Sequence, residues 1–284
     1  PYLFELTTPV AQIEMIGPGS NHFILQRRGD GKWTIPGETF PVDGESVQSF
    51  IQMLASVRIS EFVKDVATPD ALAAYGLARP SRQIILRSAV GGTNAVIAHL
   101  LFGAARTNEV FVQRSDENSI YAISPEDFAG LPSGPAWQFR DRQVWKFAEG
   151  DVAKITVHQK GKTMEVLHEG PNKWSLAAGS QGIIIPAGIE YTAHDLGDLA
   201  VGSAQAWLAR GNTIPARFGF RPDGLSVIAT LKDGRAFSLD IGTQLGGNTA
   251  LAAVTLGGER WVFILPSDLY YFITTYLASS PNVP

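Results

Sequence analysis

The sequence contains no cysteine and no long uninterrupted apolar run. The absence of cysteine excludes a disulfide scaffold, a thiolate metal site and a cysteine nucleophile. A membrane-spanning helix needs roughly 18 consecutive apolar residues. The longest candidate, Thr249 to Leu265, is interrupted by Gly257, Gly258, Glu259 and Arg260. The sequence itself therefore predicts no membrane span within this chain.

Neither sign of charge is concentrated along the chain, which has 23 Lys and Arg against 27 Asp and Glu and a formal net charge of −4. Nucleic-acid binding and attraction to an anionic membrane surface both need a concentrated basic face. We therefore expect neither as a partner. Apolar residues are abundant, at 45% of 284 residues. This length and composition favour about two globular domains with substantial cores.

Familiar catalytic and cofactor motifs are also missing. The sequence has no Walker A loop, no dinucleotide-binding glycine fingerprint and no His-Glu-x-x-His metal motif. The segment Gly17-Pro18-Gly19-Ser20 lacks the lysine of a phosphate-binding loop and is better explained as a hairpin turn. The five histidines are scattered, without a third ligand near any pair. We predict a non-enzymatic protein with no catalytic residues, no cofactor and no metal site.

The chain does contain an internal repeat with a period of about 140 residues. Trp33 and Trp174 occupy matching positions and are expected to be equivalent core anchors. Other landmarks recur in the same order, namely Val10–Met15 with Val152–Val157, Tyr75-Gly76-Leu77 with Phe218-Gly219-Phe220, and Phe102-Gly103 with Ile241-Gly242. This order predicts two tandem copies of one unit, the first over residues 1–145 and the second, more diverged, over 146–284.

The periodicity of each copy predicts an α+β fold with a mainly antiparallel sheet. Apolar residues alternate with polar ones along Ala153–His158, as in a half-buried strand. Asp233-Gly234 between two such segments is typical of a tight hairpin turn. Turns this short cannot connect parallel strands. We expect one longer and two short helices in each copy.

The longer helix is expected to be regular in the first copy and irregular in the second. The first copy has apolar residues at helical spacing, which predicts a helix that starts near Asp43 and buries one face; these residues are Val47, Phe50, Ile51 and Leu54. Its counterpart in the second copy is expected at about residues 192–209. That segment contains Gly197 and Gly202, and each glycine lowers helix propensity by about 1 kcal/mol. We expect that helix to be irregular or broken.

These landmarks resemble those of the domain of unknown function 4340 family. The residues that carry the resemblance are Val10 and Ile13, Trp33, Pro41 and Asp43, the step from Tyr75 to Pro80, and Arg140-Asp141-Arg142. The first copy matches the whole pattern. The second keeps Phe218-Gly219-Phe220-Arg221-Pro222 but has no acidic residue after Pro186 and no second Arg-Asp-Arg.

The resemblance implies a bacterial envelope protein with one N-terminal membrane anchor and a large extracytoplasmic part. Such proteins are often encoded beside ABC-transporter components similar to the gliding-motility auxiliary system. By resemblance, this chain would be the extracytoplasmic (periplasmic) accessory or scaffold part, anchored by a segment outside the chain. Its expected partners are membrane subunits of a transporter-like complex. The alternative is a glycan- or peptide-binding module that uses the cleft between the repeats.

Two groups of residues are candidates for a special function. Asp141 could act as a catalytic acid or base between Arg140 and Arg142, or the three residues could form an ion-pair network at the junction of the copies. Near the C-terminus, helical spacing leaves Tyr270 and Tyr271 away from the main apolar face. This aromatic helix either caps the second core or offers an interaction surface, because exposed aromatic residues are typical of interfaces.

Overall fold

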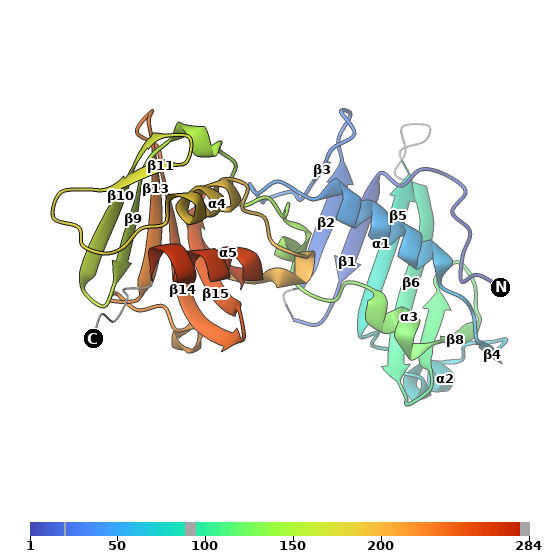
Figure 1. Cartoon of the computed structure of the whole chain (residues 1–284). Coiled ribbons are helices and arrows are strands. Elements are labelled where there is room, and N and C mark those ends of the chain that lie inside the picture. Colours follow the sequence, from blue (N-terminus) through green and yellow to red (C-terminus); the bar gives the residue numbers. More distant parts are fainter. Residues whose placement is uncertain (20, 89–94, 279–284) are drawn as a thin grey trace. The chain divides into compact units, whose positions relative to one another are not determined.

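A computed structural model describes residues 1–19, 21–88 and 95–278 of the chain. The chain forms two compact units, which we call unit 1 (Pro1–Asp141) and unit 2 (Arg142–Pro284). The division lies a few residues before the predicted one after residue 145. Each unit contains an eight-stranded sheet in which neighbouring strands are antiparallel (Figure 1). Two antiparallel sheets with few helices agree with the predicted fold class.

Unit 1 begins with three strands, followed by a helix, a strand, a short helix and two hairpins. Its elements are β1 (Gln12–Ile16), β2 (His22–Arg27), β3 (Trp33–Thr34), α1 (Gly44–Ser56), β4 (Glu61–Lys64), α2 (Pro69–Ala74), β5 (Arg82–Ser88), β6 (Ala95–Ala105), β7 (Val110–Arg114), β8 (Ile120–Ile123), α3 (Pro125–Gly130) and the 3-10 turn η2 (Ala136–Phe139). The strand order in the sheet is β3-β2-β1-β5-β6-β7-β8-β4.

Unit 2 has a closely similar sequence of elements. They are the 3-10 turn η3 (Glu149–Asp151), β9 (Val152–Gln159), β10 (Lys162–Gly170), β11 (Lys173–Leu176), α4 (Pro186–Gly197), the 3-10 turn η4 (Ala204–Ala206), β12 (Trp207–Arg210), the 3-10 turn η5 (Ala216–Phe218), β13 (Leu225–Leu231), β14 (Ala236–Gly246), β15 (Thr249–Leu256), β16 (Glu259–Leu265), α5 (Ser267–Phe272) and the π-helical turn η6 (Ile273–Leu277). The order in the sheet is β11-β10-β9-β13-β14-β15-β16-β12.

The two sheets therefore have the same strand order, with β9–β16 of unit 2 in the places of β1–β8 of unit 1. In both, the third and fourth strands of the unit, which follow each other in sequence, lie at opposite edges of the sheet. These edge strands are short, with two residues in β3 and four each in β4, β11 and β12. The shared order supports the tandem duplication, whose common origin stays a prediction.

Helix α1 is formed as its sequence pattern predicts. The side chain of Asp43 accepts a hydrogen bond from the backbone N–H of Glu45 and so caps the N-terminus of the helix. The four predicted residues, Val47, Phe50, Ile51 and Leu54, are all buried. Figure 1 shows α1 lying across the strands of unit 1. The helix thereby covers one face of the sheet.

The expected position of the counterpart helix in unit 2 was wrong. Helix α4 begins at Pro186 rather than near residue 192 and ends at Gly197 rather than near residue 209. Proline suits the first helical position because its missing N–H has no intrahelical acceptor there. The helix buries Ile189, Ala193 and Leu196 at helical spacing. The predicted start was too late because Pro186 was not treated as a helix start.

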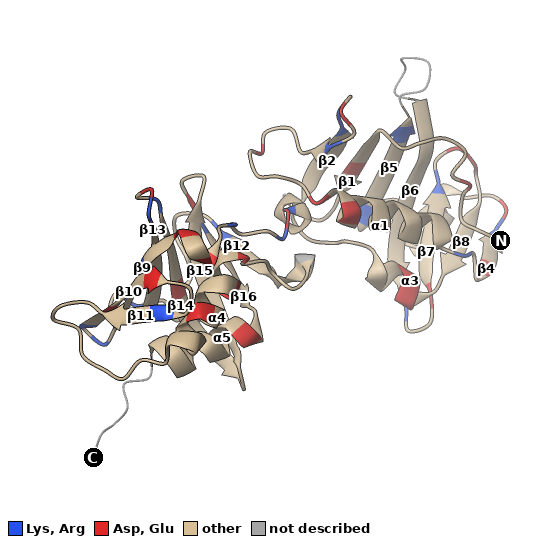
Figure 2. Ribbon diagram, turned by 45° about the horizontal axis from the view of Figure 1, so that its top comes forward, with Lys and Arg blue, Asp and Glu red and all other residues tan. Residues whose placement is uncertain are grey.

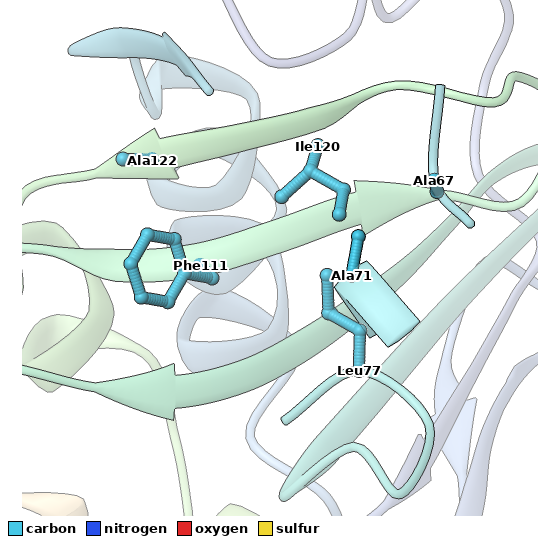
Figure 3. Close-up of a cluster of buried hydrophobic side chains, with 6 residues drawn as sticks. All are labelled: Ala67, Ala71, Leu77, Phe111, Ile120 and Ala122. Carbon is cyan, nitrogen blue, oxygen red and sulfur yellow. The ribbon is translucent and has the colours of Figure 1, made fainter. Parts of the chain in front are cut away.

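A small second core lies beneath α2. Side chains of α2, of the segments just before and after it, and of β7 and β8 meet there, as Figure 3 shows; they are Ala67, Ala71, Leu77, Phe111, Ile120 and Ala122. The ring of Tyr75 packs against that of Phe111, with 4.5 Å between the ring centroids. This cluster fixes the Tyr-Gly-Leu step against the sheet.

The glycine steps found by sequence comparison form the same contact in both units. In unit 1 the backbone N–H of Ala104 donates a hydrogen bond of 2.8 Å to the carbonyl oxygen of Tyr75. This close approach requires Gly103, because a Cβ atom there would overlap that carbonyl oxygen. Gly242 lies in the same way against the carbonyl oxygen of Phe218 in unit 2. We call these two contacts the glycine latches.

Each latch needs a second glycine on the opposing segment. Gly76 has a φ of +72° and Gly219 a φ of +75°, in the left-handed region that glycine adopts at little cost. A Cβ atom at Gly76 would crowd the backbone of Ala104, and one at Gly219 would crowd Thr243. The sequence landmarks Tyr-Gly-Leu and Phe-Gly-Phe are therefore the turns that dock onto β6 and β14.

Candidate functional site

Exposed aromatic side chains gather on the helices of unit 2. Tyr271 on α5 is exposed, at 44%, whereas Tyr270 beside it is partly buried. The ring of Tyr271 lies 5.8 Å from that of Phe272, measured between centroids. Phe272 in turn stacks at 6.3 Å on Tyr191 of α4, which is 64% exposed. We call Tyr191, Tyr271 and Phe272 the aromatic surface.

Of the two alternatives for the C-terminal segment, the structure shows the capping of the core, and its use as an interaction surface stays a prediction. Leu269, Ile273 and Leu277 are buried, so this segment does cap the core of unit 2. The C-terminal segment packs closely against α4 at Gly188, where a Cβ atom would overlap the ring of Tyr276. This close packing of α4 on the C-terminal segment places Tyr191 beside Phe272. The sequence analysis missed Tyr191, because its pairing depends on how two helices pack.

Acidic residues lie on the same two helices, where their positions along the ribbon are red in Figure 2. Asp195 is one helical turn after Tyr191. Burial raises the pKa of its carboxyl; His194 acts against this rise, and the negative charges of Asp268 and Asp198 add to it. Asp198 forms an ion pair with Lys146 across 3.3 Å. Asp195 of α4 and Asp268 of α5 lie one helical turn from Tyr191 and Phe272, so carboxylates border the aromatic surface. They favour a partner that carries positive charge.

A buried polar cluster lies between α4 and the edge of the sheet. His168 of β10 stacks on Trp174 of β11 with 4.2 Å between the ring centroids and 11° between the planes. The indole N–H of Trp174 donates a hydrogen bond of 2.6 Å to Oε2 of Glu190 on α4. The same oxygen lies 3.4 Å from Nε2 of His168, whose side chain is 3% exposed. Trp174 is thus buried as predicted, and it also binds a carboxylate.

The strand pattern around His168 is the one sequence signal for this cluster. Residues two apart in a strand point to the same face, so His168 had to share the face of buried Val166. A histidine on a buried face needs polar partners. The partner Glu190 could not be identified from the sequence, because it depends on where α4 starts.

The Arg140-Asp141-Arg142 segment spans the division between the two units. Arg140 is buried, and its guanidinium lies 5.8 Å from the centroid of the Phe40 ring. The backbone N–H of Asp141 donates to the carbonyl oxygen of Pro41 in unit 1. In unit 2 the carbonyl oxygen of Arg142 accepts from the N–H of Val201. These backbone bonds anchor the segment on either side; its ion-pair network stays a prediction.

The main polar cluster on the sheet of unit 1 is centred on Glu14. Its carboxylate accepts a hydrogen bond of 2.8 Å from Arg87 and lies 2.9 Å from Nε2 of His22. The hydrogen bond with His22, followed by the bond and the charge of Arg87, holds the pKa of Glu14 below its usual value. The cluster links three adjacent strands, β2, β1 and β5.

We expect Glu14→Gln to make unit 1 less sensitive to acid. A carboxyl with a lowered pKa in the folded state stabilises the fold above the ordinary pKa of 4.5 and loses that contribution as the pH falls below it. Glu14→Gln should therefore cost about 1 kcal/mol of unfolding free energy at neutral pH and almost nothing at about pH 3. Urea unfolding across this range measures both values. An equal loss at both pH values would contradict the assignment.

Neither a metal centre nor a membrane span is found in the described part of the chain. Within residues 1–19, 21–88 and 95–278, no three histidine or acidic side chains are grouped so that they could hold a metal ion. His158 lies against Thr163, and His99 against Gln83. Among the same residues, no helix is both long and apolar enough to cross a bilayer.

Comparison with known proteins identifies a family for the chain. No curated protein and no solved structure matches it. One family model, described as Domain of unknown function (DUF4340), matches residues 33–186. This match covers more than half of the 284 residues. It runs from the start of β3 to the first residue of α4, and so extends over parts of both units. The chain therefore belongs to the family of the Domain of unknown function (DUF4340).

Proposed function

We propose that this chain is a non-enzymatic accessory or scaffold part of a membrane-anchored envelope protein. In this proposal the chain lies on the extracytoplasmic side, its anchor is outside the sequence described here, and it docks onto subunits of an ABC-transporter-like complex. The observation that carries the docking function is the aromatic surface of unit 2. The envelope location and the transporter partner come from the family resemblance.

The aromatic surface has the composition of a docking site. Tyr191 and Tyr271 expose large rings that have few rotatable bonds, so a partner can bury much apolar area at low entropic cost. Both rings contact Phe272, which holds them in place before a partner binds. The carboxylates of Asp195 and Asp268 border the rings and would attract a positively charged partner segment.

We expect the double change Tyr191→Ala and Tyr271→Ala to weaken binding to a transporter subunit by at least tenfold, because exposed aromatic anchors commonly contribute about 2 kcal/mol or more. The test is in-cell crosslinking of the full-length, anchored protein, with quantification of the transporter subunits encoded beside it. Tyr2→Ala is the control, because Tyr2 is a similarly exposed aromatic residue in unit 1. Equal crosslinking of both variants would contradict docking through the aromatic surface.

The glycan- or peptide-binding alternative makes a different prediction. A ligand that binds only the folded protein raises its unfolding temperature in proportion to the logarithm of ligand concentration. Thermal unfolding in the presence of purified cell-wall fragments therefore separates the two functions. Stabilisation by such fragments, together with no crosslinking to transporter subunits, would replace the docking proposal with the binding-module proposal.

A further inference from the structure

The imidazole of His168 is held on three sides. Its Nδ1 lies 3.0 Å from the carbonyl oxygen of Val152, which can only accept a hydrogen bond. Nδ1 must therefore carry a proton. One ring face stacks on Trp174, and the side chain is almost completely buried. The orientation of the ring is thus fixed by the first residue of β9 and by β11.

The other ring nitrogen faces a carboxylate. Nε2 of His168 is buried, makes no hydrogen bond with the described residues, and lies 3.4 Å from Oε2 of Glu190. In the neutral ring, with its proton on Nδ1, Nε2 presents a lone pair to that oxygen, and the two repel each other. When Nε2 is protonated, the same geometry becomes a charge-assisted contact. The attraction of the Glu190 carboxylate therefore opposes the cost of burying a charged ring.

We propose that His168, Trp174 and Glu190 form a proton-dependent clasp that fastens α4 to the sheet of unit 2. Protonation of His168 strengthens the hold on Glu190, and loss of the proton leaves only the Trp174 bond. Histidine changes its charge between about pH 5 and 8, whereas a glutamate stays ionised in that range. The clasp is therefore tight in mild acid and loosens as the pH rises past neutrality.

A second carboxylate, that of Glu149, also lies near His168. Glu149 of η3 lies close enough for the two charges to interact, and a hydrogen bond from its own backbone N–H, followed by one with His194, lowers the pKa of Glu149. His194, on the next turn of α4 after Glu190, lies 3.2 Å from Glu149. The carboxylates of Glu190 on α4 and Glu149 on η3 therefore lie near His168, and His194 contacts Glu149.

Unit 1 has no equivalent of the clasp among its described residues. Trp33 is buried there as Trp174 is in unit 2. The residue paired with Trp33 across the strands is Arg27, which is exposed and directs its guanidinium to the carbonyl oxygen of Gly31. The pairing that places His168 opposite Trp174 has the same register. Only unit 2, which carries the aromatic surface, combines the tryptophan with a buried histidine and a helix carboxylate in the described part of the chain.

The clasp connects pH to the docking surface. Tyr191 follows Glu190 directly in α4, so a change in the position of that helix turn moves the ring that stacks on Phe272. This consequence rests on the proposed docking function. The clasp itself does not, and the experiment below measures it without any partner.

The test is an NMR titration of the wild-type chain from about pH 5 to 8. We expect the imidazole signals of His168 and the indole N–H signal of Trp174 to shift with one shared midpoint. Glu190→Gln keeps an oxygen acceptor for Trp174 but removes the charge. It should abolish the gain in stability that the wild type shows in mild acid over about pH 8 because of this contact. His194→Gln is the control on the same helix and should retain most of this gain.

Two results would overturn the clasp. One is a wild-type titration in which the Trp174 indole signal does not follow His168, and this remains decisive if Glu190→Gln fails to fold. The other is a folded Glu190→Gln variant with the full wild-type dependence of stability on pH. Neither the NMR titration nor the stability measurement needs a docking partner. Failure of the docking experiment would leave both unchanged, so the two proposals are tested separately.

Discussion

Replacing Gly103 or Gly242 by alanine is expected to destabilise the unit that contains it by about 3 kcal/mol or more. In each case the new methyl group would overlap a backbone carbonyl oxygen, of Tyr75 or of Phe218. A backbone atom cannot move aside as a flexible side chain can. The turn must therefore lift off the strand, and the hydrogen bond from Ala104 to Tyr75 is lost in unit 1.

The control for both changes is Gly150→Ala. A methyl group at Gly150 would have no neighbouring atom within 4 Å, and the backbone there is not in the left-handed region. Its replacement should change stability by less than about 1 kcal/mol. Chemical denaturation followed by NMR reports each unit separately. Wild-type denaturation midpoints for Gly103→Ala and Gly242→Ala would show that the latches do not need glycine.

Replacing Trp145 by alanine should cost unit 2 about 3–5 kcal/mol, which is typical of a buried tryptophan. The ring of Trp145 lies 5.3 Å from that of Phe237, and its indole N–H donates to the carbonyl oxygen of Leu196. The last carbonyl groups of a helix have no partner within the helix. Trp145 satisfies one of them, and the N–H of Phe147 satisfies that of Gly197.

Trp145→Phe separates the two contributions. Phenylalanine keeps most of the apolar contact with Phe237 but leaves the carbonyl oxygen of Leu196 without its indole donor. This change should cost about 1–3 kcal/mol, because a buried acceptor would lose its hydrogen bond. Thermal and urea unfolding of the two variants give both values. If Trp145→Ala is no worse than Trp145→Phe, packing of the ring contributes little and the explanation fails.

The fold could be predicted from the sequence where local patterns determine the structure. The apolar spacing of Val47, Phe50 and Leu54 predicted the buried face of α1. Helical spacing places these side chains on one face, and that face packs on the core whatever the order of the strands. Gly76 and Gly219 recur at the same place in the two copies for a local reason, since positive φ is unfavourable for other residues.

The candidate site was only partly predictable, because its contacts join distant segments. Tyr271 could be recognised from helical spacing alone. Tyr191 and Glu190 could not, since both depend on α4 starting at Pro186 and on its contact with the C-terminal segment through Gly188. The contacts of His168 could not be predicted either, because they arise from the packing of α4 over the sheet edge.

The short outermost strands restrict how this protein can associate with other chains. A strand that joins a sheet forms hydrogen bonds with unpaired backbone groups along an open edge. Strand β3 offers two residues for such pairing and β4, β11 and β12 four each, and β4 also carries Glu61 and Lys64. Few backbone groups are therefore available for edge-to-edge polymerisation. Recognition of a partner is left to side chains, which can be exchanged without altering the sheet.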